Sequence, residues 1–242
     1  MNYYRIESSP TAFYSAVFDA YADKEAYLTS DCVLQASFCD QVFSLHPSSE
    51  KASRVKNKLL RIDQESIFEI ERLFRHKRTD REQLALLYVR EIVKAKAPVR
   101  GNFSNPVYAE VAYSLQQIAY EIDHLKGFLR FTENEQGVLY APYESDHDLI
   151  DLILPHFERR MGNTPFILHD KKRNRLAIWN GKCHTLAILE EDATFVPSAE
   201  ERAWQSLWKS YYAHVNIPLR KNERQMRAHM PVRYWKYLPE KH

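Results

Sequence analysis

The sequence predicts an α+β fold, with a helix-rich region over residues 1–126 and an α+β region over residues 127–242. Three observations support this. Apolar residues recur at helical spacing in the first region, short alternating runs replace them in the second, and Asn180-Gly181 stands between two apolar runs. Asn-Gly in that setting is the strongest short-range signal for a β-hairpin. The expected order ββ-α-βββ-α predicts an antiparallel sheet with helices packed on one face. The two regions are either separate domains or one packed unit.

A short strand pair and several helices are expected in the first region. Residues 2–6 and 41–45 alternate apolar and polar side chains, as strands do. Ser9 followed by Pro10 is typical of the start of a helix, because serine caps free backbone N–H groups and proline fits the first helical position. Ser48 likewise opens a basic helix. Most of the first region is therefore predicted to be helical.

Two further helices are expected before residue 126. Thr79 and Glu82 have the spacing of a capping box, in which each side chain accepts a hydrogen bond from the other residue's backbone N–H. Asn105-Pro106 begins the next helix, whose apolar residues recur at intervals of three and four. Such a stripe indicates a buried face, and it comprises Val107, Val111, Leu115, Ile118, Ile122 and Leu125.

The second region combines short strands with helices. Strands are expected at 128–131, 138–143, 166–169, 175–179 and 182–188. Ser145 with Asp148 predicts a helix start between the second and third strands, and Ser198 with Glu201 predicts another after the last strand.

Two helices are expected to end the chain. The helix after Ser198 has an apolar stripe at helical spacing, and a final helix is expected over 218–230. Pro231 ends it, because proline disfavours the helical conformation at the residue before it. The stripe comprises Trp204, Leu207, Trp208, Tyr211, Tyr212 and Val215.

Composition and motifs exclude several classes of protein. The chain has 242 residues, of which 45% are hydrophobic and 27% charged, as in an ordinary soluble globular protein. It has no Gly-rich phosphate loop, no GxSxG serine motif and no apolar run of about 18 residues. Its first residues lack the pattern of a secretion signal. We therefore expect a cytoplasmic protein that does not enter the membrane.

The cysteines predict neither a disulfide framework nor a metal centre. Cys32, Cys39 and Cys183 are odd in number and widely spaced, whereas a thiolate zinc site or an iron–sulfur cluster normally needs four thiolates. We expect free thiols, and the sequence indicates no metal and no cofactor.

Charge is distributed unevenly although the net charge is only +2. Residues 51–100 carry 14 Lys/Arg against 7 Asp/Glu, and residues 201–242 carry 9 against 3. The block between them, 101–150, carries 2 against 8. The two basic blocks either form one positive face, if the fold brings them together, or are solvated helix surfaces with local ion pairs.

The last residues, 219–242, hold the strongest functional signal, with seven Lys/Arg against two Glu. Interleaved cations and aromatic side chains are what a protein surface uses to bind phosphates and stack on bases. The cations Arg220, Arg224 and Arg227 share one face of the expected final helix. Alternatively, the aromatic residues fill the core and the cations only face solvent. The candidate nucleic-acid-binding residues here are Arg220, Arg224, Arg227, Arg233, Trp235 and Lys236.

A second basic cluster lies at the expected turn over 170–174. A basic hairpin tip can reach a groove or backbone of a nucleic acid, but it can equally serve solubility. Its candidate residues are Lys171, Lys172, Arg173 and Arg175.

His147 and Asp151 are weak catalytic candidates. Their spacing places them one turn apart if both lie on the helix predicted after Ser145, and a carboxylate there can orient an imidazole for acid–base work or metal binding. A structural or capping role explains the pair as well, since no further converging ligand is evident.

Four segments together resemble a known bacterial family. They are HLKGFLRF at 124–131, APYESDHDLIDLILPHFERRM at 141–161, PFILHDKKRNRLAIWNGK at 165–182, and LWKSYYAHVNIPLRKNERQMRAHMPVRYWKYLPE at 207–240. The family is a domain of unknown function labelled as a DNA repair or DNA metabolism protein. Its members accompany a radical S-adenosylmethionine (radical SAM) protein or are fused ahead of a uracil-DNA-glycosylase-type domain. The resemblance implies a stand-alone member that works beside the radical SAM protein.

Three functional hypotheses follow. The resemblance and the basic tail favour an accessory protein that binds single-stranded or damaged DNA and presents it to the radical SAM partner. The alternatives are a nucleobase- or nucleotide-processing enzyme with a pocket near His147 and Asp151, and a protein–protein interaction module without direct DNA contact.

Overall fold

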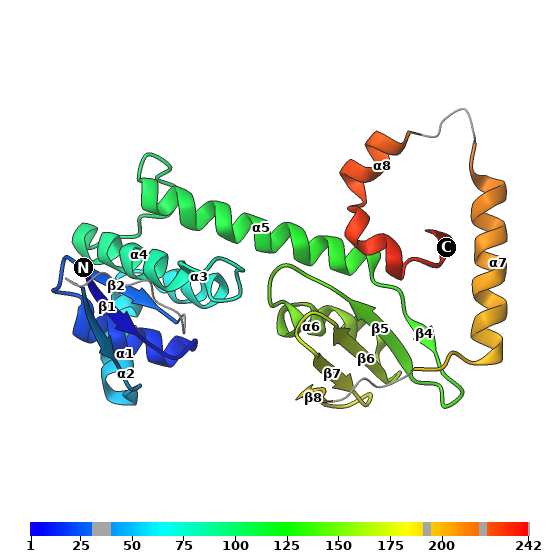
Figure 1. Cartoon of the computed structure of the whole chain (residues 1–242), viewed down its shortest axis with the longest axis horizontal. Helices are drawn as coiled ribbons and strands as arrows, with labels where there is room; N and C mark the ends of the chain where they lie inside the picture. Colours follow the sequence, from blue (N-terminus) through cyan, green and yellow to red (C-terminus); the bar gives the residue numbers. More distant parts are fainter. Residues whose placement is uncertain (31–39, 191–194, 218–221, 242) are drawn as a thin grey trace. The chain divides into compact units, whose positions relative to one another are not determined.

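The computed structural model describes residues 1–30, 40–190, 195–217 and 222–241. The chain divides into two compact units, Met1–Ala119 and Tyr120–His242, which are described separately below (Figure 1). The boundary lies within the long helix α5 (Pro106–Phe128). The division predicted after residue 126 lies near the end of the same helix.

The first unit contains a small parallel sheet with the strand order β2-β1-β3. Its strands are β1 (Asn2–Arg5), β2 (Ala26–Thr29) and β3 (Gln41–Ser44). Helix α1 (Pro10–Ala20) connects β1 to β2, which lets both strands run in the same direction. The predicted strand pair is present, and β2 is an addition that its short sequence did not indicate.

Four helices complete this unit: α2 (Ser49–Ile62), α3 (Glu65–Leu73), α4 (Arg81–Ala95) and the first part of α5. The predicted serine caps are confirmed. Ser9 Oγ accepts a hydrogen bond from Ala12 N at 3.2 Å, and Ser48 Oγ accepts one from Lys51 N at 3.5 Å.

The predicted capping box at Thr79 and Glu82 is wrong. Helix α4 follows Asp80, and no side chain caps it. The carboxylate of Glu82 is buried, where it accepts hydrogen bonds from the Ser30 hydroxyl at 2.8 Å and from Arg81 at 3.1 Å. A tertiary contact therefore replaces the local one.

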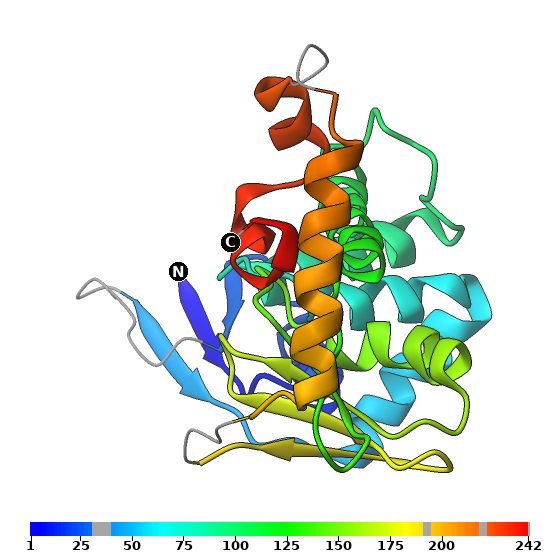
Figure 2. The same ribbon diagram turned by 90° about the vertical axis from the view of Figure 1, so that its right-hand side faces the viewer.

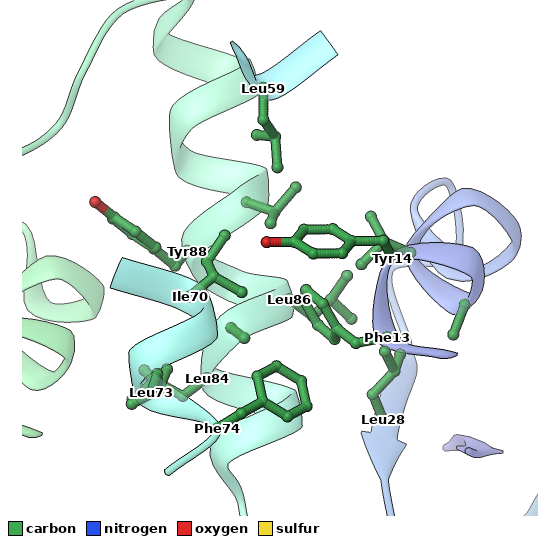
Figure 3. Close-up of a cluster of buried hydrophobic side chains, with 14 of the residues drawn as sticks. Phe13, Tyr14, Leu28, Leu59, Ile70, Leu73, Phe74, Leu84, Leu86 and Tyr88 are labelled. Carbon is green, nitrogen blue, oxygen red and sulfur yellow. The ribbon is translucent and has the colours of Figure 1, made fainter. Parts of the chain in front are cut away.

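Buried aromatic and aliphatic side chains from α1, α3 and α4 form the core of the first unit (Figure 3). Phe13 of α1 meets Phe74 edge-on, with ring centroids 5.2 Å apart, and Tyr14 beside it is fully buried. Leu86 of α4 is also fully buried. The predicted stripe of α5 contributes Val111 to this core.

The second unit holds a five-stranded sheet with the order β4-β5-β6-β7-β8. Its strands are β4 (Thr132–Glu133), β5 (Leu139–Tyr143), β6 (Phe166–Asp170), β7 (Arg175–Trp179) and β8 (His184–Ile188). The predicted α+β class is confirmed, but the sheet is mixed and not purely antiparallel, because β5 and β6 pair in parallel. Helix α6 (Ile150–Met161) connects them, so the chain returns in the same direction.

Two predicted boundaries in this unit are wrong. Residues 128–131 are not a strand, because α5 continues to Phe128 and the strand that pairs with β5 on this side is β4, which begins at Thr132. Helix α6 begins at Ile150, not near Ser145, whose hydroxyl donates a hydrogen bond to His147 O at 2.6 Å. Helix α6 packs on β6 and β7 through a buried face that includes Phe157.

The predicted Asn-Gly hairpin joins β7 and β8, which pair in antiparallel register. Asn180 Oδ1 accepts hydrogen bonds from Lys182 N and Cys183 N, both at 2.9 Å, and Gly181 has a φ of +90°. Cys183 is a free, exposed thiol. Cys32 and Cys39 lie outside the described residues.

The chain ends in α7 (Ala199–Val215), α8 (Glu223–His229) and two 3-10 helices, η2 (Val232–Tyr237) and η3 (Pro239–Lys241). The Ser198 hydroxyl caps α7 as predicted. The final helix, predicted over 218–230, begins at Glu223, and 218–221 lie outside the described residues. Helix α7 runs beside the 3-10 segment, with which it is in contact (Figure 2).

Gly181→Ala is expected to destabilise the protein by about 2 kcal/mol, because its φ is positive and a Cβ there would lie 2.4 Å from Asn163 O. Gly127→Ala is the matched control, since nothing lies within 4 Å of a Cβ at that position and its φ is ordinary. Urea denaturation of both variants checks the prediction, and equal unfolding free energies would contradict it.

Candidate nucleic-acid interface

Most of the predicted cations of the tail and hairpin contact carboxylates of the second unit. Lys236 Nζ lies 2.5 Å from Glu144, and Arg175 lies 2.6 Å from Asp148. The Lys236 ammonium and the Tyr237 hydroxyl hold the pKa of Glu144 below its ordinary value. These cations stabilise the fold locally and are less available to a polyanion.

Glu121 of α5 takes part in several of these contacts. Its buried carboxylate accepts hydrogen bonds from the backbone N–H groups of Asp146 and His147, both at 2.9 Å, and forms an ion pair with Arg233 at 2.9 Å. Arg233 also lies 2.8 Å from the Asp146 carboxylate. One carboxylate thus joins α5, the loop before α6 and the C-terminal 3-10 helix.

The turn after β6 is held in a similar way. Arg173 lies 2.9 Å from the buried carboxylate of Asp170 and donates to Asp146 O at 2.7 Å. Burial raises the pKa of Asp170, and the Arg173 guanidinium opposes that rise. Lys172 is exposed and lies 3.7 Å from Asp146, and Lys171 is partly exposed.

His147 and Asp151 do not lie on the same helix. His147 precedes α6, so the expected one-turn spacing does not hold. Its side chain is 3% exposed, and its Nε2 lies 3.9 Å from Glu121. Asp151 is in the first turn of α6. A catalytic role for the pair stays a prediction. Among the described residues, no group of three or more His, Cys, Asp or Glu is placed to hold a metal ion.

A cleft lies between the end of α7, helix α8 and the C-terminal 3-10 helices, with a volume of about 780 Å³. Tyr212 and Trp235 line it, and Lys241 Nζ lies 5.5 Å and 5.0 Å from the centres of their rings. Lys241 also donates to the Tyr212 hydroxyl at 3.3 Å. Two aromatic rings are thus held around one cation.

Polar and charged side chains also line this cleft, among them the carboxylates of Glu223 and Glu240. Asn216, Asn222 and Gln225 supply amide groups, and Arg227 supplies a guanidinium that is 3.7 Å from Glu223. That ion pair is exposed on both sides and therefore weak. Arg224 of the same helix is exposed. Arg220 lies outside the described residues.

This combination suits a nucleotide. Aromatic rings stack on bases, amides both donate to and accept from base edges, and a guanidinium binds phosphate with two parallel hydrogen bonds. Of the sequence candidates, the cleft brings together Arg227 and Trp235. It adds Tyr212 from the predicted stripe, Lys241 from the basic tail, and the three amides, which had no distinguishing local pattern.

Helix α7 differs from the other long helices because none of its residues is buried. Its predicted apolar stripe is present but faces solvent: Trp204 is 67% exposed, Leu207 58% and Tyr211 56%. An exposed patch of this kind is typical of a surface that binds another molecule.

One family model matches residues 79–240, two thirds of the chain. The chain belongs to the family described as domain of unknown function DUF4130. The match covers the whole second unit except its last two residues, and it includes α4 and α5. No curated protein matches the chain. Within the described residues, no helix combines the length and hydropathy of a membrane span.

Glu121→Gln is expected to lower the free energy of unfolding by about 3 kcal/mol, because it leaves Arg233 without its buried countercharge and presents an NH2 group to backbone donors. Asp123→Asn on the same helix is the control, since Asp123 is 74% exposed and its pair with Lys126 is a surface one. Denaturation measured by circular dichroism should separate the two, and similar losses would refute the assigned role of Glu121.

Proposed function

We propose that this DUF4130 protein is a DNA-associated accessory protein that binds single-stranded or damaged DNA in the cleft between α7, α8 and the C-terminal 3-10 helices. The observation that carries the proposal is the grouping of Tyr212, Trp235 and Arg227 around one cleft of about 780 Å³. A volume of that size accommodates a nucleotide-sized ligand.

The distribution of ion pairs supports this location over the rest of the basic tail. Arg233 and Lys236 are held by carboxylates within 3 Å, whereas Arg224 and Arg227 of α8 are exposed. Binding of a phosphate to Arg224 or Arg227 therefore breaks fewer strong ion pairs than binding to Arg233 or Lys236 would. A single strand suits the cleft because its bases are free to stack on the aromatic rings.

The partner in this proposal is the radical SAM protein that the family resemblance implies. Helix α7 supports a protein contact, because its exposed Trp204, Leu207 and Tyr211 are residue types that need a covering surface. The accessory protein would then hold DNA on one side of α7 and its partner enzyme on the other.

Arg224→Glu with Arg227→Glu is expected to weaken binding of a fluorescein-labelled oligothymidylate, measured by anisotropy between roughly 50 and 200 mM salt. The slope of log affinity against log salt should fall in magnitude by roughly 1.4, because each phosphate contact with a single strand contributes about 0.7 and two are lost.

Arg159→Glu with Arg160→Glu is the matched control, since these exposed residues of α6 make the same change in net charge away from the cleft. If both pairs of substitutions weakened DNA binding equally, the binding would depend on the overall charge of the protein and not on the cleft. Tyr212→Leu should reduce affinity for the oligothymidylate roughly fivefold or more but leave an abasic oligonucleotide unaffected. No binding by the unaltered protein at low salt would refute the proposal.

Trp204→Ala with Leu207→Ala is expected to abolish co-purification with the radical SAM protein while leaving oligothymidylate binding unchanged, because both side chains are exposed and neither lines the cleft. Phe103→Ala is the control, as Phe103 is 68% exposed in the first unit. Retained co-purification of the α7 variant would exclude this surface as the contact.

A further inference from the structure

A second cleft lies in the first unit, between α1, α2 and α4, with a volume of about 320 Å³. Its lining is mainly apolar. Helix α1 contributes Val17 and Phe18, the residue after this helix is Tyr21, and α2 contributes Val55 and Leu59. Phe18 and Tyr21 are each 40% exposed, so apolar surface remains open to solvent at this place.

Each helix presents a pair of lining residues one turn apart. These are Val17 with Tyr21 at the end of α1, Val55 and Leu59 on α2, and Val89 with Val93 on α4. Val17, Leu59 and Val89 are buried and form the floor of the cleft, whereas Tyr21, Val55 and Val93 leave apolar surface accessible above it. A helix with its own apolar row can pack against such a surface, because side chains at four-residue spacing lie on one face of a helix.

The charges at this cleft have one sign. Arg54 and Lys58, one turn apart on α2, are its charged lining residues, and both are exposed. No Asp or Glu is among the described residues that line it. The nearby carboxylate of Asp19 is held by Lys51, with both oxygens within 2.8 Å of Nζ.

The side chain of Arg54 is held in place by an aromatic ring. Its guanidinium lies over the ring of Phe18, 4.9 Å from the ring centre. A guanidinium stacked on an aromatic face keeps its N–H edge available for a carboxylate. The rim of the cleft thus offers an ordered cation next to an apolar surface.

We propose that this cleft binds an acidic amphipathic helix of a partner protein. The apolar row of that helix fills the space between α1, α2 and α4, and its flanking carboxylates pair with Arg54 and Lys58. Helix-in-groove recognition of this kind combines apolar anchors at one-turn spacing with complementary charge at the edges. Because the site lies in the first unit, the inference does not depend on the proposed DNA cleft of the second.

The probe is a labelled peptide with leucine at one-turn spacing and glutamate on both flanks, titrated with the full chain by anisotropy. Arg54→Glu with Lys58→Glu should weaken binding about tenfold or more. Val93→Phe should also weaken it, because the larger side chain occupies the cleft while both cations remain. Arg5→Glu with Arg72→Glu is the control of equal charge change, since both residues are exposed and neither lines the cleft.

Thermal unfolding of each variant confirms that it is folded before its affinity is compared. A scrambled peptide of the same composition, with its leucines on no common face, should bind at least tenfold more weakly than the designed one. Equal binding of the scrambled peptide, insensitivity to Val93→Phe, displacement of the peptide by oligothymidylate, or no binding at all would each overturn the proposal.

Discussion

The second unit depends on one buried carboxylate, that of Glu121. The Glu121 side chain is only 3% exposed, and a buried carboxylate is costly unless it has partners. Here the partners are two backbone N–H groups of the loop before α6 and the guanidinium of Arg233. The C-terminal segment is therefore held to α5 by an ion pair whose carboxylate is buried. The position of Trp235, two residues after Arg233, follows from it, and so does one side of the cleft.

This arrangement divides the basic tail into two groups with different tasks. Arg233 and Lys236 each form a short ion pair with a carboxylate of the second unit, at 2.9 Å and 2.5 Å, although both side chains remain partly open to solvent. The cations of α8 and Lys241 face the cleft or solvent. A count of positive charges along the tail therefore overstates the surface available to a polyanion, although the tail does contribute the aromatic and cationic lining of the cleft.

Local chemistry made much of the fold predictable, while long-range pairing did not. The serine caps at Ser9, Ser48 and Ser198 and the hairpin at Asn180-Gly181 depend on neighbouring residues alone, and all are present. The parallel pairing of β5 with β6 depends on how α6 packs back on the sheet, which no short pattern records. Glu82 likewise fits the capping pattern, but its carboxylate accepts a hydrogen bond from Ser30, which is far away in the sequence.

The site was predictable only in part, for the same reason. Arg227 and Trp235 stand out because charge and aromatic content rise together in the tail. The three amide residues of the cleft are ordinary polar residues in the sequence, namely Asn216, Asn222 and Gln225. They can be recognised as part of a site only once α7, α8 and the 3-10 helices are seen to form one cleft. Glu121 has no local signal at all, since its importance comes from Arg233, more than a hundred positions later.

The lack of buried side chains in α7 has a consequence for how the cleft behaves. The side-chain contacts of this helix are polar, such as Gln205 Nε2 with Thr132 at 3.5 Å and Trp208 Nε1 with Glu240 at 3.1 Å, so the helix is expected to open at a lower free-energy cost than the sheet. A ligand that touches both Tyr212 and α8 would have to order that helix on arrival, so part of its binding energy would be spent on rigidity. Under the proposed function, a partner that covers the outer side of α7 would also order the cleft for its ligand.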